Sequence, residues 1–245
     1  MAPDSGAPQT GPTVRSQTAA RDRLAEAIDA ARARILDRQR ADGCWQYELE
    51  ADCTIPAEYI LMLHYLGESD RLLEARLADY LRGHQSRDGG WPLYPGGALD
   101  VSCSVKCYCA LKLAGDRADA PHMARARTAI LAHGGAARSN VFTRIALALF
   151  GALPWRGVPF LPVEIVLLPR WFPFNLGKVS YWSRTVMVPL SVLTTLKPRA
   201  ANPLGVQVRE LFVTPPEQEQ HYFHPRSLLN RLLIACEHIV RRFEP

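Results

Sequence analysis

The sequence lacks several features that would assign it to a protein class at once. It contains no run of about 18 uncharged apolar residues, so no membrane-spanning helix is expected. Its first seventeen residues have no apolar core of the kind found in secretory signals, which favours a cytoplasmic protein with reduced thiols. It has no Walker loop, no Gly-x-Gly-x-x-Gly and no Gly-x-Ser-x-Gly, and no Cys-x-x-Cys pair among its six cysteines. Neither a cofactor nor a metal site is therefore predicted.

Aspartate is absent from the second half of the chain. All twelve aspartates lie at or before Asp119. Residues 1–119 carry 14 Lys and Arg against 18 Asp and Glu, whereas residues 120–245 carry 15 against 6, a net charge of +9. A basic half favours an anionic partner, either a membrane surface or nucleic acid. Its basic residues alternate with apolar runs and form no known nucleic-acid-binding motif, so a nucleic-acid partner is not expected.

A repeated motif is the most informative feature present. Residues 39–45 and 85–91 both read Gln-x-x-Asp-Gly-x-Trp, 46 residues apart. Each follows a helical pattern with an aliphatic residue four positions before the Gln, and each precedes a second helical pattern, at 52–67 and 100–115. The sequence therefore predicts stacked helical hairpins, each built as helix, Gln–Trp turn, helix and terminal glycine.

The chemistry of the motif indicates a structural tie between helices. The Asp-Gly pair suits a tight turn with positive φ at Gly43 and Gly89. Gln39 and Gln85 stand in the last helical turn, where an amide can donate to carbonyls that lack a partner. The indoles offer a large apolar surface to neighbouring helices. The predicted structural residues are Gln39, Gly43, Trp45, Gln85, Gly89 and Trp91.

The remaining pattern predicts an all-α chain with two parts. Residues 1–17 are expected to be a disordered tail, and residues 18–245 a single α domain. The first helix should stop near Gly43, and a third hairpin without a Gln–Trp turn is predicted from Pro121 to about Phe150. A helix kinked at Pro189 should cover 179–196, residues 198–225 are Pro-rich and polar, and 225–243 is again helical.

The tandem motifs resemble the QW repeats of triterpene cyclases. Four further stretches, at 48–59, 91–97, 140–144 and 180–185, are similar in order to the N-terminal region of bacterial squalene–hopene cyclases. The resemblance runs from about residue 20 to the end and weakens after about residue 200. It implies the smaller, inserted α-α toroid of a two-toroid enzyme. It also implies the cyclisation of squalene to hopene and hopanol, which is isomerase chemistry, with lyase chemistry for hopanol.

The resemblance also bears on the site residues. The family's protonating acid lies in an Asp-x-Asp-Asp motif, and the nearest approach here, Asp116-Arg-Ala-Asp119, has the wrong spacing. No catalytic residue is assigned, and the chain alone is expected to be an inactive N-terminal portion. Trp182 matches a family tryptophan at the substrate cavity, and Val179 and Met187 are expected near the entrance constriction. The resemblance also implies squalene as substrate, and a homodimer is considered for the intact enzyme.

The last helical pattern predicts attachment to a membrane surface. Apolar residues recur on one side of 225–243, with arginines at the margins, which suits a helix in the interface plane. A core-facing helix has the same periodicity and is the alternative. We expect peripheral attachment to the cytoplasmic side of the inner membrane through Leu229, Leu232, Leu233, Ile239, Val240 and Phe243.

Two other functions compete with the cyclase hypothesis. A non-enzymatic helical-repeat protein could bind a membrane or a protein partner through the same hairpins. A prenyltransferase subunit would share the toroid but would require a zinc site of Asp, Cys and His, and no such spacing is visible.

Overall fold

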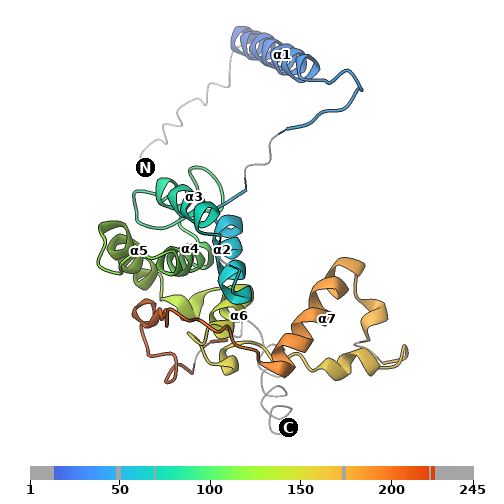
Figure 1. The fold of residues 1–245 in the computed structure, drawn as a ribbon. Helices are drawn as coiled ribbons and strands as arrows, with labels where there is room; N and C mark the ends of the chain where they lie inside the picture. The colour runs from blue at the N-terminus through green and yellow to red at the C-terminus, as the bar shows by residue number, and fades with distance from the viewer. Residues whose placement is uncertain (1–13, 48–50, 69, 173–174, 221, 224–245) are drawn as a thin grey trace, which may run out of the picture. The chain divides into compact units, whose positions relative to one another are not determined.

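The chain is helical throughout the part that the structure describes. The computed structural model describes residues 14–47, 51–68, 70–172, 175–220 and 222–223, and these contain no strand (Figure 1). The all-α prediction is confirmed. The α-helices are α1 Val14–Asp37, α2 Thr54–Leu66, α3 Arg71–Gly83, α4 Val101–Leu113, α5 Pro121–Ala132, α6 Val141–Leu149 and α7 Tyr181–Leu196. Short 3-10 helices are η1 Ala136–Arg138, η2 Trp155–Gly157, η3 Val163–Leu167, η4 Leu176–Lys178 and η5 Arg209–Leu211. No helix in these ranges is long and apolar enough to cross a membrane.

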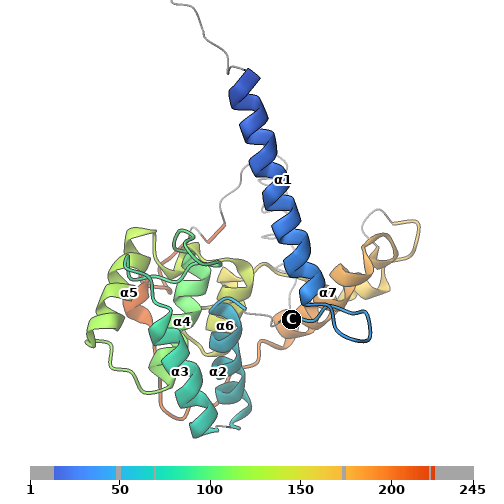
Figure 2. The same ribbon diagram turned by 90° about the horizontal axis from the view of Figure 1, so that it is seen from above.

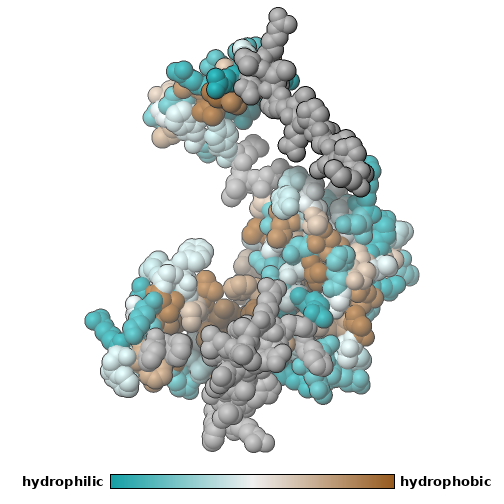
Figure 3. Space-filling view, turned by 180° about the vertical axis from the view of Figure 1, so that it is seen from behind, coloured by the Kyte–Doolittle hydropathy of each residue, from teal (hydrophilic) through white to brown (hydrophobic). Residues whose placement is uncertain are grey.

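The first of two compact units, residues 1–50, contains α1 and the first Gln–Trp turn. Helix α1 begins at Val14, inside the predicted tail, whose residues 1–13 lie outside the described part. It ends at Asp37, and Gly43 with φ of 82° belongs to the turn that follows. Leu24, Ile28 and Ile35, which recur at helical spacing, are exposed along α1, where apolar surface is visible in Figure 3.

Helix α4 lies at the centre of the second unit, residues 51–245. Its sequence has no charged face, and a helix that is apolar all round is stable only when it is enclosed. It contacts α2, α3, α5 and α6, as Figure 2 shows, and eleven of its thirteen residues are buried. Helices α2, α3, α5 and α6 therefore assemble around α4, while α1, the first helix of the repeat, belongs to the other unit.

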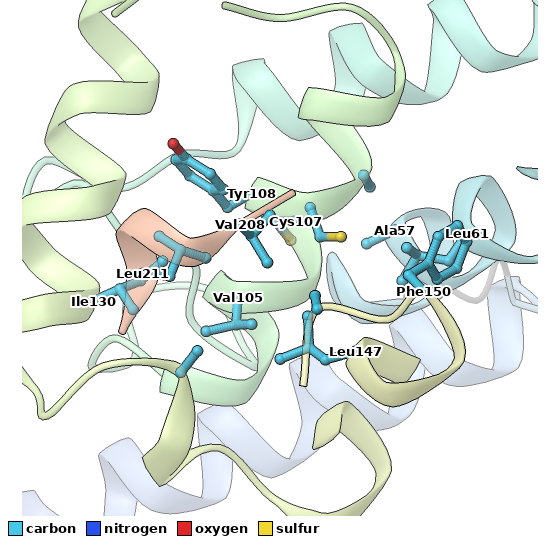
Figure 4. Packing of buried hydrophobic residues seen from close by; sticks show 14 of the residues in the cluster. Ala57, Leu61, Val105, Cys107, Tyr108, Ile130, Leu147, Phe150, Val208 and Leu211 are labelled. Carbon is cyan, nitrogen blue, oxygen red and sulfur yellow. The ribbon is translucent and has the colours of Figure 1, made fainter. Parts of the chain in front are cut away.

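The core around α4 includes a segment that the sequence did not predict to be buried. Residues 198–225 were expected to be polar loop, yet Val208, Leu211 and Phe212 are buried against α4 and α5 (Figure 4). Glu210 fixes this segment, since it accepts a 2.9 Å hydrogen bond from the Tyr108 hydroxyl and pairs with Lys112. Apolar residues only a few positions apart were enough to add a layer to the core.

Polar side chains cap the helix starts. Asp70 accepts hydrogen bonds from the backbone N–H of Leu72 and Leu73 at 3.0 and 3.1 Å. Asp100 accepts from Cys103 at 2.7 Å, and at the start of α6 Asn140 caps the helix through a 2.9 Å bond from Thr143. These bonds satisfy backbone donors that a helix start leaves free, and they set where each helix begins.

One carboxylate joins α3 to the loop between α4 and α5. Asp116 accepts two hydrogen bonds from Arg82, at 3.0 and 2.6 Å, and lies 2.7 Å from Nε2 of His122. Burial alone would raise the pKa of Asp116, but the hydrogen bonds and charges of Arg82 and His122 hold this pKa below its ordinary value of 3.8. The fork geometry makes this a strong tie between neighbouring hairpins.

Replacing Asp116 with Asn should destabilise the chain in a pH-dependent way. A carboxylate with a lowered folded pKa contributes stability that is present above the unfolded pKa and lost as the pH falls through the folded pKa. We expect a loss of about 2–3 kcal/mol in the free energy of unfolding at pH 7, shrinking toward zero under acid conditions. Urea unfolding at a series of pH values from 2 to 7 measures this loss. Asp119→Asn, which removes only the exposed pair with Arg117, is the control and should change little. A loss that stays constant down to pH 2 would contradict the assignment.

Candidate functional site

The second Gln–Trp turn is a closed set of hydrogen bonds between α3, α4 and α5. The Trp91 indole N–H donates to the carbonyl of Leu81 at 2.8 Å, and the side chain has 0% exposure. The Gln85 amide donates to the carbonyls of Gly89 and His122, each at 2.8 Å, and its oxygen accepts from Arg125 at 2.7 Å. Every polar group of the Gln–Trp pair is thus bound to a helix or to the turn, which leaves none for a ligand.

The first turn repeats the local part of this arrangement. The Trp45 indole N–H donates to the carbonyl of Ile35 at 2.7 Å, and the Gln39 amide donates to that of Gly43 at 2.8 Å. Trp45, however, is 44% exposed. The same sequence therefore forms the same turn whether or not its indole is covered.

The two side chains exchange the roles that the sequence suggested. The predicted donor to the helix carbonyl was the Gln amide, but in both turns the indole N–H takes that carbonyl and the amide closes the turn. At Gly89, φ is 93° and a β-carbon would stand 2.7 Å from the carbonyl oxygen of Arg125. Glycine is needed here for both backbone conformation and space.

Three helix starts gather at one end of the second unit. Ser102 at the start of α4 accepts a 2.8 Å hydrogen bond from the N–H of Asn140, which precedes α6. The Cys107 thiol, in the second turn of α4, donates at 3.5 Å to the carbonyl of Cys53, which precedes α2. We call this end of α2, α4 and α6 the helix-start cluster. Helix starts carry partial positive charge, so anionic or polarisable groups are favoured there.

Two buried cations near the helix-start cluster were not predicted. Lys106, only 5% exposed, lies 2.7 Å from the carboxylate of Glu58 on α2. Arg144 on α6 donates to the carbonyl of Tyr222 at 2.7 Å and stacks over the ring of Phe223, 5.0 Å from its centroid. A lysine inside a run of small and apolar residues was the available signal, because a buried cation requires a partner.

The predicted cavity residues lie at and around the start of α7. Trp182 stands in the first turn of α7 and is 77% exposed, whereas Val179 and Met187 are partly buried. Leu190, two turns later, packs against the core, and Thr194 donates to the carbonyl of Leu161 at 3.0 Å. The start of α7 therefore presents aromatic surface while its later turns are anchored.

The buried thiols behave as packing groups. Sγ of Cys103 and Cys107 are 3.9 Å apart on one face of α4, and burial raises the pKa of Cys107 and Cys109. In the described ranges no group of three His, Cys, Asp or Glu side chains has metal-binding geometry. The predicted membrane-surface residues, from Leu229 to Phe243, lie outside the described residues.

Comparison with known proteins identifies the family of the chain. Residues 28–245 match the squalene–hopene cyclase N-terminal domain. The chain belongs to this family. It is 58% identical over 194 residues to the squalene–hopene cyclase of Bradyrhizobium diazoefficiens, covering 79% of the chain and 29% of that relative. It is 52% identical over 222 residues to that of Zymomonas mobilis, covering 89% and 33%. The Alicyclobacillus acidocaldarius enzyme is 37% identical over 196 residues, covering 79% and 31%. The chain thus spans about a third of the length of these cyclases.

The two tryptophans of the repeat should differ in their effect on stability. Trp91→Ala leaves a cavity at a fully buried site and should lower the free energy of unfolding by about 3–5 kcal/mol. Trp45→Ala removes a partly exposed ring and one hydrogen bond, so about 1 kcal/mol is expected. Thermal unfolding followed by circular dichroism compares the two variants, which share one motif. Equal losses would show that the motif stabilises its turn irrespective of burial.

Proposed function

We propose that this chain supplies part of the substrate cavity and of the membrane attachment of a squalene–hopene cyclase. The identity of 58% to a relative named for this activity carries the proposal. The family match over residues 28–245 includes the Gln–Trp turns and the stretch around Trp182. Squalene is the substrate class, and hopene and hopanol are the products of the whole enzyme in this proposal. The proposed assembly of that enzyme is a homodimer.

The apolar surface near the start of α7 supports a hydrocarbon-facing role. Tyr181 and Trp182 are exposed there, and Leu167 and Trp171 are exposed on η3 and the loop after it. Helix α7 packs on η3, so these side chains belong to one part of the chain. Aromatic faces attract cations, and a cyclisation that proceeds through carbocations would use them. Val179 and Met187 would then narrow the entrance beside Trp182.

The proton donor is assigned to another part of the enzyme. Attack on an alkene requires a carboxylic acid kept protonated by its surroundings. The chain contains no Asp-x-Asp-Asp, and Asp116 and Asp119 are each paired with arginine, with pKa values below the ordinary range. A carboxyl group with a lowered pKa is ionised near neutral pH, so it carries no proton to donate to an alkene. The chain therefore contributes shape and surface to the reaction.

A chimera tests this assignment. This chain replaces the matching third of the Bradyrhizobium diazoefficiens cyclase, and hopene is measured after incubation with squalene in detergent. The chimera should form hopene, and the 245-residue chain alone should form none. Trp182→Ala should lower kcat/KM by about tenfold, the scale of one cation–π contact.

Tyr94→Ala is the matched control, because Tyr94 is an exposed aromatic residue, 67% against 77% for Trp182, outside the surface around α7. It should leave kcat/KM close to that of the parent chimera. Hopene from the isolated chain would overturn the assignment of the acid, and equal losses in the two variants would overturn the role of Trp182.

Membrane attachment is proposed through residues 225–243. The segment has an apolar stripe with arginines at its margins. It belongs to residues 120–245, whose net charge of +9 suits an anionic leaflet. The proposed location is the cytoplasmic face of the inner membrane, without spanning it. Peripheral binding would bring the enzyme to a substrate that dissolves in lipid.

Liposome flotation tests the attachment. With anionic vesicles, the intact chain should float, and Leu229→Glu/Leu233→Glu should remain in the soluble fraction because two charges replace the centre of the apolar stripe. Asn230→Glu/His238→Glu, at polar positions of the same segment, adds the same charge and is the control, which should still float. Equal flotation of the wild type and the Leu variant would assign this segment to the protein core.

A further inference from the structure

A cavity of 560 Å³ lies at the end of the second unit where α2 and α4 finish. The start of α3 and residues 201–204 complete its walls. Most of its lining is aliphatic, including Leu63, Leu113 and Leu204. Helices of thirteen residues are about 20 Å long, so this cavity is separated by that length from the helix-start cluster. Its volume falls in the range of small-molecule sites.

The repeat itself creates the open space in this cavity. Gly67 and Gly115 occupy the same position in the two hairpins, and both adopt positive φ, 73° and 102°. A β-carbon built on either glycine would have no heavy atom within 4 Å. The two helix ends therefore finish beside empty space. They also bring carbonyl groups that lack partners within the helix, which are acceptors for hydrogen bonds.

One buried polar pair lines the cavity. Nε2 of His64 lies 3.0 Å from a carboxylate oxygen of Glu74, and each side chain is only 12% exposed. The other carboxylate oxygen of Glu74 accepts no hydrogen bond from the described residues. It is an acceptor within a largely apolar wall, and a ligand hydroxyl could donate to it.

The surrounding charges decide the chemistry of the ligand. Two helix ends with partial negative charge, together with Glu74, would repel an anionic head group. These groups attract a cationic head group, but Arg71 offsets that attraction, and the largely apolar lining would strip the charge of its water. An uncharged hydroxyl meets neither penalty and satisfies the acceptors. We propose that this cavity binds an uncharged alcohol with an aliphatic body, its hydroxyl directed to Glu74 and its hydrocarbon against the leucines. This proposal does not depend on the proposed cyclase function.

Three ligands with one aliphatic body test the proposal. Isothermal titration of the intact 245-residue chain with 1-decanol, decanoate and decylammonium, all below their aggregation concentrations, separates the hydrocarbon from the head group. Decanol should bind saturably at one site, and each charged analogue about tenfold more weakly. Absence of saturable decanol binding, or tighter binding of either charged analogue, overturns the proposal.

Variants at exposed positions locate the site. Ala75→Trp and Leu204→Trp fill the cavity from opposite walls and should abolish decanol binding, whereas Arg76→Trp, next on α3 but outside the cavity, should bind within about twofold of wild type. Glu74→Gln should weaken binding about fivefold, the value of one hydrogen bond. If circular dichroism shows that Ala75→Trp is unfolded, decanol binding by Leu204→Trp alone locates the site. If Ala75→Trp or Leu204→Trp is folded and still binds decanol as tightly as wild type, the cavity is not the binding site.

Discussion

The enclosure of α4 on all sides constrains the rest of the second unit. A helix buried this completely cannot leave its polar groups to water, so each must find a partner on a neighbouring element. Lys106 pairs with Glu58 on α2, Tyr108 donates to Glu210, and Ser104 accepts from the N–H of Trp91. Each contact joins α4 to a different segment. The polar positions on α4 therefore specify which neighbour lies against which face, which apolar packing alone would leave less defined.

Elements with local signals could be predicted from the sequence. The repeat indicated the helices that flank each Gln–Trp turn, Pro121 marked a helix start, and the glycines marked turns, because each of these effects acts within a few residues. The burial of Val208 and Leu211 could not be predicted in the same way. It depends on contacts with helices about a hundred residues earlier. A short apolar cluster among prolines has no periodicity that distinguishes a core layer from a loop.

In the candidate site, too, residues with local signals could be predicted and residues that depend on distant contacts could not. Gly89 was predictable, since an Asp-Gly turn needs positive φ wherever it occurs. The pairing of Lys106 with Glu58 spans 48 residues and becomes visible only when α2 and α4 lie side by side. For Trp182 the family motif supplied an expected role, whereas the residue types around it specify no more than an exposed aromatic surface.

The two Gln–Trp turns share the same local hydrogen bonds but differ in how they pack. Both close through an amide to a turn carbonyl and an indole N–H to a helix carbonyl, at nearly identical distances. Only the turn at residues 85–91 gains contacts beyond its own hairpin, from the carbonyl of His122 and the guanidinium of Arg125 on α5. Among described residues, none gives Gln39 a comparable second partner. The motif thus encodes a turn by itself, and a following helix converts it into an anchor by hydrogen bonding to its glutamine. A repeat built this way can form each hairpin locally and gain most of its stability when the next hairpin stacks on it.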